Sequence, residues 1–302
     1  MANTKAWIQA ARLRTLPLSL SGIIVGTALA MMHGQFDVTI FVLALLTTVG
    51  FQVTSNFAND YGDGVKGTDN EDRIGPVRAL QSGAISRANL KNGIIISIII
   101  SMALALVLIY KAFGLDNLLY ILIFFVLGLL SIWAAIKYTM GSNPYGYKGM
   151  GDLFVFLFFG LLGVLGSMFL FTKSLHATAW LPAIAIGLLC VGVLNLNNLR
   201  DVVSDKKHGK YTLVVKMGFE NGKQYHFALI SIPLLCFLLF IYLENIHWSH
   251  SFFLLAFIPL LIHLRKVMVT QDPGLLDGEL KKLALSTFLL AVLFIISVNI
   301  FL

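Results

Sequence analysis

The sequence predicts an all-α membrane protein in which nine transmembrane helices form one bundle, a single domain spanning residues 1–302. Three observations predict this fold class. The chain is 58% hydrophobic and only 12% charged, whereas soluble domains carry about 25% charged residues. The apolar residues form runs long enough to cross a bilayer. The charged residues lie almost entirely between these runs, so lipid is the solvent that suits the chain.

Each expected span is a run of about 20 mostly apolar residues, the length that crosses a bilayer as a helix. In order along the chain, the runs are 15–33, 38–58, 93–113, 117–137, 152–172, 179–199, 226–243, 251–269 and 283–302. The seventh and eighth runs contain Pro233 and Pro259, which predict kinks.

The basic residues predict the side of the membrane on which each connecting segment lies. All of the 22 Lys and Arg residues except Lys111 and Lys173 lie in alternate segments, beginning with the N-terminal one. This bias predicts a multi-pass protein of the cytoplasmic membrane with its N-terminus inside. The long loops at about 59–92 and 200–225 are then cytoplasmic, and we expect the function there. The same pattern explains the net charge of +7 without nucleic acid.

Two clusters of Asn and Asp end the second and sixth expected spans. The clusters comprise Asn56, Asn59, Asp60 and Asp63 in the first, and Asn198, Asp201 and Asp205 in the second. Residues three and four apart share one face of a helix, so each cluster is expected to project together. A lone Asp at a helix end can simply be solvated. Two clusters this close to the bilayer favour a functional site, because ionisable groups there are costly.

The clusters lie at similar places in two halves of the chain, about 140 residues apart, which indicates two pseudo-repeated halves. Carboxylate and amide oxygens suit Mg²⁺, which is commonly bound by a few carboxylates together with substrate phosphates and water. If the two helices face each other, they would hold two Mg²⁺ ions that bridge one diphosphate.

Basic residues follow each acidic cluster closely, and a third cytoplasmic loop adds tyrosines. The expected diphosphate-binding residues are Lys66, Arg73, Arg78, Lys148 and Lys210. Cations at these places can neutralise the phosphate oxygens that the metal leaves free. We expect Lys5, Lys281 and Lys282 only to set the orientation of the chain. The tyrosines, Tyr138, Tyr145 and Tyr147, either face a cation or an aromatic substrate, or belong to the interfacial belt.

These motifs resemble those of the UbiA superfamily of intramembrane aromatic prenyltransferases, and the resemblance covers nearly the whole chain. Asn59, Asp60 and Asp63 match the superfamily's Asn-Asp-x-x-Asp motif, and Asp201 and Asp205 match its Asp-x-x-x-Asp motif. The stretches Asn-Asp-Tyr-Gly-Asp and Asp-Arg-Ile-Gly-Pro-x-Arg are most similar to the menaquinone branch.

The sequence departs from the superfamily at one place. Gly67 stands where many members have a third Asp, and the next carboxylate is Asp69. The role of Asp69 therefore stays open.

The resemblance implies that the chain transfers a polyprenyl group from a polyprenyl diphosphate to 1,4-dihydroxy-2-naphthoate, with loss of the carboxylate as CO₂. It implies Mg²⁺ as the cofactor, held by Asn59, Asp63, Asp201 and Asp205, with Asp60 supporting the first set. The expected catalytic residues are Asp60, Asp63, Asp201 and Asp205. The prenyl tail would lie among the apolar spans, within the bilayer.

Other functions remain open on the residues alone. The nearest is a prenyltransferase for another acceptor, such as 4-hydroxybenzoate or a haem precursor. A cation transporter also carries acids on facing helices, but the clusters here lie at one membrane face, away from the midplane. A CDP-alcohol phosphotransferase would carry its acids in one continuous motif, which this chain lacks.

Overall fold

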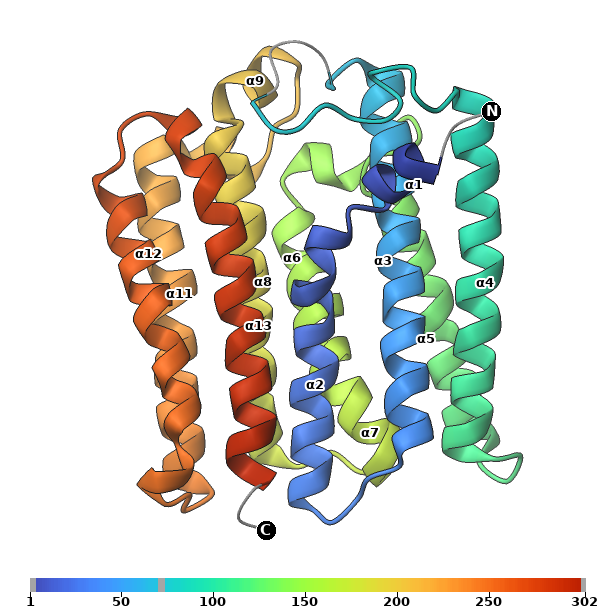
Figure 1. The fold of residues 1–302 in the computed structure, drawn as a ribbon, viewed down its shortest axis with the longest axis vertical. Coiled ribbons are helices and arrows are strands. Elements are labelled where there is room, and N and C mark those ends of the chain that lie inside the picture. The colour runs from blue at the N-terminus through green and yellow to red at the C-terminus, as the bar shows by residue number, and fades with distance from the viewer. Residues whose placement is uncertain (1–3, 70–73, 300–302) are drawn as a thin grey trace.

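The computed structural model describes residues 4–69 and 74–299, and the regular elements in these ranges are all helical (Figure 1). Among these residues, nine helical segments are long and apolar enough to cross a membrane, which confirms the predicted number. The main helices are α1 (Thr4–Ala11), α2 (Leu16–Met32), α3 (Val38–Lys66), α4 (Arg87–Phe113), α5 (Leu118–Lys137), α6 (Gly151–Val155), α7 (Ser167–Thr172), α8 (Trp180–Arg200), α9 (Val202–Lys207), α10 (Leu213–Met217), α11 (Phe219–Leu243), α12 (Phe257–Val269) and α13 (Asp277–Asn299). A π-helix, Phe156–Gly166, joins α6 to α7 within one span.

Several helices extend beyond the apolar runs that predicted them. α4, α11 and α13 begin six or seven residues before the expected starts at 93, 226 and 283. Their polar first turns continue the helix into the interfacial region. In α4 the side chain of Ser86 caps this turn by accepting the backbone N–H of Asn89. α3 likewise runs past 58 and ends at Lys66, where it is capped by Gly67, whose φ of 75° is the left-handed conformation that favours glycine.

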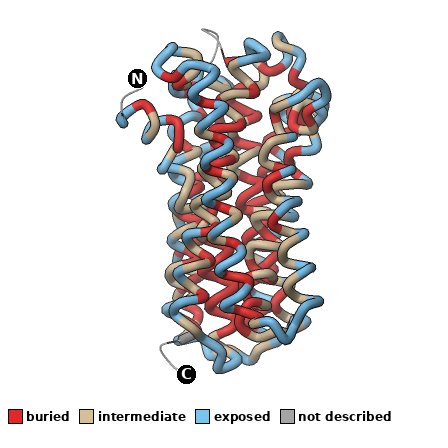
Figure 2. Tube along the Cα trace, turned by 90° about the vertical axis from the view of Figure 1, so that its right-hand side faces the viewer, coloured by how far each residue is buried: buried red, intermediate tan, exposed pale blue. Residues whose placement is uncertain are grey.

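The spans form a bundle in which α2 stands between α3 on one side and α13 on the other (Figure 1). Small residues let α2 approach the π-helix closely, as is common in membrane bundles. A Cβ added at Gly26 would lie 2.3 Å from the carbonyl oxygen of Val164. Buried residues face the bundle interior, and exposed ones follow its outer surface (Figure 2).

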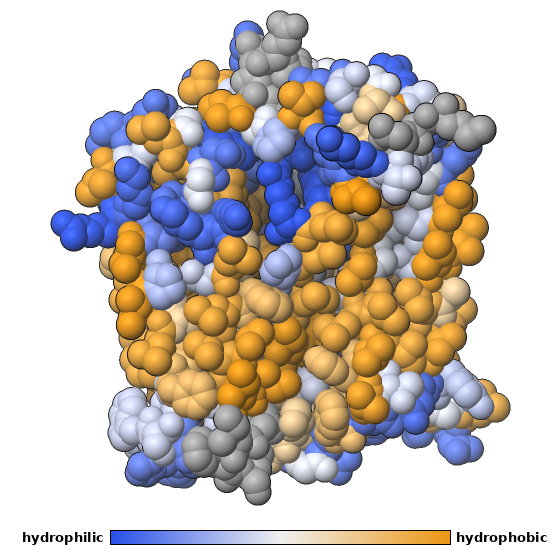
Figure 3. All heavy atoms as spheres, viewed as in Figure 1, coloured by the Kyte–Doolittle hydropathy of each residue, from blue (hydrophilic) through white to orange (hydrophobic). Residues whose placement is uncertain are grey.

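The outer surface matches a bilayer environment. Figure 3 shows an apolar belt between two polar ends, and a recess lined by hydrophilic residues at the end that carries α9. Exposed residues of the belt include Ile99, Leu122 and Ile262. The chain is therefore a multi-pass membrane protein whose polar groups gather at one end of the bundle interior.

Candidate active site

A cavity of about 700 Å³ lies inside the bundle, and both acidic clusters contribute to its polar end. Its polar lining includes Asn59, Asp63, Asp201, Asp205 and Lys210. Its apolar lining includes Ile23, Leu108, Ile109, Phe124 and Leu170. The cavity thus combines an ionic site at one end with a long hydrophobic interior, and residues far apart in the sequence meet in it.

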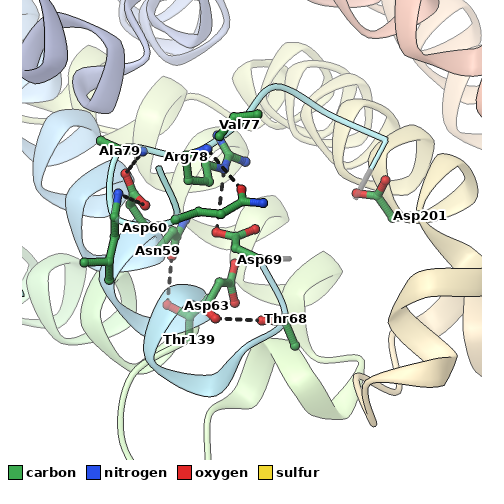
Figure 4. Close-up of polar contacts among 12 residues, drawn as sticks. Asn59, Asp60, Asp63, Thr68, Asp69, Val77, Arg78, Ala79, Thr139 and Asp201 are labelled. Atoms are coloured by element: carbon green, nitrogen blue, oxygen red, sulfur yellow. Dashed lines mark hydrogen bonds and ion pairs between the residues drawn. The ribbon is translucent and has the colours of Figure 1, made fainter. Parts of the chain in front are cut away.

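The first cluster lies on the last turns of α3, and its cavity-facing members are held by neutral donors. The hydroxyl of Tyr147 donates to Oδ1 of Asp63 at 2.8 Å. Oγ1 of Thr139 donates to Oδ1 of Asn59 at 3.4 Å (Figure 4). Both donors are neutral groups, so they orient the Asp63 carboxylate and the Asn59 amide without forming an ion pair with them.

The other two members of the first cluster face away from this cavity. Asn56 donates through Nδ2 to the carbonyl of Ala11 at 2.8 Å, which fixes the connection between α1 and α2. Asp60 accepts the backbone N–H groups of Ala79 and Leu80 at 3.3 and 3.4 Å (Figure 4). Each residue turns about 100° around a helix, so Asp60 cannot share the direction of Asn59. Asp60 therefore holds the backbone at Ala79 and Leu80 and does not line the cavity, and its catalytic role stays a prediction.

The second cluster spans a break between two helices, where we expected one continuous face. α8 ends at Arg200 and α9 begins at Val202, with Asp201 between them. The backbone N–H of Asp205 donates to the carbonyl of Asp201 at 2.8 Å, which keeps these two acids one turn apart. Both line the cavity, whereas Asn198 is buried and does not.

The charges of the two clusters act on one another across the cavity. Burial raises the pKa of Asp205 to about 6, and Asp201 and Asp63 add to this rise while Lys210 opposes it. Burial lowers the pKa of Lys210, but Asp205 and Asp63 outweigh it, so the pKa lies above its ordinary value. Lys210 is therefore a firmly protonated cation between acids from both halves of the chain.

The predicted diphosphate-binding residues separate into two groups. Lys210 and Arg78 line the cavity, and Nε of Arg78 lies 3.8 Å from Oδ2 of Asp69. Lys66 turns away from it and donates to the carbonyls of Thr139 and Gly141, at 2.8 and 2.7 Å. Lys148 is exposed and does not line it either. Lys66 points elsewhere because the last turn of α3 directs it to the loop carbonyls outside the cavity. Arg73 lies outside the described residues.

The predicted tyrosines lie at or beside the polar end. Tyr138 and Tyr145 line the cavity, and Tyr147 reaches it through its bond to Asp63. Burial raises the pKa of Tyr138 to about 12, so its ring is a neutral phenol. The ring of Tyr145 stacks on that of Phe154, with centroids 4.0 Å apart. These rings supply electron-rich surface close to the ionic site.

The cavity also contains residues to which the sequence analysis assigned no role in the site. They include Arg12, Arg14, Gln52, Asp69, Asn197, Arg200, Asp277 and Lys281. Lys281, which we expected only to orient the chain, also borders the cavity, because the first turns of α13 lie beside it. Gln52 was detectable in principle, since it lies two helical turns before Asn59 on the same face. No pattern in the sequence indicated Asp277.

The donor set fits Mg²⁺ bound together with a phosphate ligand. Among the described residues, Oδ2 of Asp205 is buried without a hydrogen-bond partner. A bare carboxylate oxygen beside a cavity is a ready metal ligand. In the same ranges, no three His, Cys, Asp or Glu side chains gather closely enough to enclose an ion alone. Phosphate oxygens and water would therefore complete the coordination, as Mg²⁺ commonly prefers.

The chain is similar to known prenyltransferases over nearly its whole length. A profile described as the UbiA prenyltransferase family matches residues 19–275. The chain is 45% identical to a 1,4-dihydroxy-2-naphthoate octaprenyltransferase from Haemophilus influenzae, with 96% of this chain and 94% of that one covered. It is 44% identical to the enzyme of the same name from Escherichia coli, with 99% and 96% covered.

Solved structures share the fold at much lower sequence identity. A UbiA homologue from Archaeoglobus fulgidus bound to DMAPP and Mg²⁺ matches with a TM-score of 0.66 at 16% identity, covering 98% of this chain and 100% of that one. A homologue from Aeropyrum pernix matches with a TM-score of 0.70 at 15% identity, covering 94% and 98%. These similarities support the nine-helix architecture.

Proposed function

The chain belongs to the UbiA prenyltransferase family, and from this we propose that it transfers a polyprenyl group from a polyprenyl diphosphate to 1,4-dihydroxy-2-naphthoate in menaquinone biosynthesis. The observation that carries the proposal is the cavity itself, which joins two acidic motifs to a long apolar interior. The names of the two relatives that match nearly the whole chain support the choice of acceptor.

In this proposal the diphosphate lies between the two acidic clusters. Asn59, Asp63, Asp201 and Asp205 would hold Mg²⁺, which supplies positive charge to the leaving diphosphate. Lys210 lies among the acids of both halves and would bind a phosphate oxygen as a fixed cation. Arg78 lines the same cavity and would add a planar donor.

The apolar interior would hold the prenyl chain with its first carbon below the diphosphate. When the allylic C–O bond breaks, its electron pair leaves with the diphosphate and positive charge develops on the prenyl carbon. The rings of Tyr138, Tyr145 and Phe154 border this region and would stabilise that charge through their electron-rich faces. The apolar walls would exclude water, which would otherwise capture the cation.

The electron-rich naphthoate ring would then form the new carbon–carbon bond. Loss of the carboxylate as CO₂ returns its electron pair to the ring and restores aromaticity. With the basic loops on the inner side, the reaction would take place at the cytoplasmic face of the cytoplasmic membrane.

The test is transfer by purified protein in detergent, with one polyprenyl diphosphate and each of two acceptors. We expect a prenylated, decarboxylated product from 1,4-dihydroxy-2-naphthoate and little from 4-hydroxybenzoate, as judged by product mass. Chelation of divalent metal should abolish the reaction, and added Mg²⁺ should restore it. Equal transfer to both acceptors would reject the proposed acceptor, and transfer that survives chelation would reject the metal.

A further inference from the structure

A buried arginine joins the second acidic cluster to α13. Nε and Nη2 of Arg200 donate to the two carboxylate oxygens of Asp201, at 2.7 and 2.6 Å. Nη1 donates to Oδ1 of Asp277 at 2.7 Å, and Nη2 also donates to Asn197 at 2.9 Å. The Arg200 side chain is only 3% exposed. Its three nitrogens are thus all engaged, so the guanidinium forms a fixed bridge between Asp201 and the first turn of α13.

That first turn is itself anchored by a chain of buried polar groups that returns to α8. Glu279 is bonded to His263 Nδ1 at 2.9 Å and to Lys282 at 2.6 Å. The Nε2 atoms of His263 and His226 lie 2.9 Å apart, and Nδ1 of His226 lies 3.2 Å from Nδ2 of Asn195. Asn195 belongs to α8. Together with Arg200 and Asp277, these contacts close a ring through α8, α11, α12 and α13.

One assignment of protons accounts for each of these hydrogen bonds. The amide of Asn195 can only donate through Nδ2, so Nδ1 of His226 accepts. Nε2–H of His226 then donates to Nε2 of His263, and Nδ1–H of His263 donates to the carboxylate of Glu279. Both histidines are neutral in this arrangement. The ring therefore holds α13 against α8 by directed hydrogen bonds inside the membrane-spanning bundle.

The charge balance around Arg200 bears on the metal site. With Asp201 alone, the guanidinium would cancel the negative charge that a metal ligand needs. Asp277 supplies a second carboxylate to the same guanidinium, which leaves the three groups with a net charge of −1 beside the cavity. Partners of this kind, which orient a ligand without touching the metal, commonly change metal affinity by about 10- to 100-fold when removed.

We propose that Asp277 is a positioning residue for Asp201, which it supports through Arg200 so that Asp201 keeps both its orientation and its charge toward a divalent cation. This inference rests on the proposed metal-binding role of Asp201. The Asp277 side chain is 48% exposed, and without it Arg200 keeps its hydrogen bonds to Asp201 and Asn197, so the loss of Asp277 leaves the guanidinium paired and should change stability little. Metal affinity and stability should therefore respond differently to its removal.

The experiment measures Mn²⁺ binding to purified full-length protein by the electron paramagnetic resonance signal of the free ion. We expect Asp277→Asn to weaken Mn²⁺ binding about tenfold, and Asp277→Glu to restore most of it. The melting temperature of Asp277→Asn should stay within about 4 °C of the unmodified protein. Asp116→Asn, which removes an exposed acid from the opposite end of the bundle, is the matched control and should bind Mn²⁺ normally.

Unchanged Mn²⁺ affinity in Asp277→Asn would overturn the inference. So would a loss of affinity that Asp277→Glu fails to restore, or one accompanied by a large fall in melting temperature, because either result indicates a purely structural role. The readout needs neither the prenyl donor nor the acceptor. If the unmodified protein binds Mn²⁺, Asp277→Asn weakens that binding, and no prenyl transfer is detected, the proposed function is rejected while the inference stands.

Discussion

The first acidic cluster lies within an uninterrupted helix, whereas the second spans the break between α8 and α9. Their supports differ as well. Asp63 receives a neutral tyrosine hydroxyl, while Asp201 receives a buried guanidinium. The comparison shows that a matched pair of motifs can be supported by groups of unequal charge. The first half holds its carboxylate with a neutral hydroxyl, whereas the second pairs its carboxylate with an arginine that a further acid, Asp277, also contacts.

The largest expected loss of activity follows from removing one carboxylate in either half. If both clusters hold metal on one diphosphate, Asp63→Ala and Asp201→Ala should each lower kcat/KM by about 10³-fold, since metal charge contributes several kcal/mol. Prenyl transfer at saturating Mg²⁺ measures both. A large loss in only one variant would break the comparison by showing that a single cluster carries the chemistry.

Lysines near the two clusters should behave differently from one another. Lys210→Ala should lower kcat/KM by about 100-fold, because it removes a buried cation that faces acids of both halves. Lys66→Ala should change it only a few-fold, because its ammonium group donates to loop carbonyls outside the cavity. Steady-state kinetics with varied diphosphate substrate separates the two. Equal losses would contradict the different positions of these side chains.

The ring of buried hydrogen bonds in the second half, which includes Glu279, should contribute more to stability than the hydroxyl that supports Asp63 in the first half. Glu279→Gln should lower the free energy of unfolding by about 2 kcal/mol, because it disturbs a buried charged network. Thermal unfolding in detergent is the measurement, with the exposed Asp116→Asn as control. A melting temperature equal to that of the control would mean that the ring does not hold α13.

Removing the neutral hydroxyl that supports Asp63 in the first half should give the smallest loss of activity. Tyr147→Phe removes the donor to Asp63 and keeps the ring, so we expect about a tenfold loss of kcat/KM. Stability should change little, since the tyrosine hydroxyl lies at the edge of the cavity. Wild-type activity in this variant would show that Asp63 needs no such support, which would sharpen the contrast with Asp201.

Much of the candidate site was predictable because its motifs are local. Asn59, Asp63, Asp201, Asp205, Arg78 and Lys210 all line the cavity, as expected of one site. Asp60 and Lys66 were predicted from their proximity in sequence, but they point elsewhere. Neighbouring residues on a helix diverge in direction, so a motif specifies a region more reliably than it specifies each side chain.

The sequence by itself determined the nine helical spans and the end of the bundle at which the acids gather. The physical reason is that a chain in lipid must satisfy its backbone hydrogen bonds within each span, so length and apolarity suffice. Only the tertiary structure decided that Lys281 borders the cavity and that Asp277 meets Arg200. Those contacts join helices distant in sequence, and they depend on how each helix is rotated and packed against its neighbours.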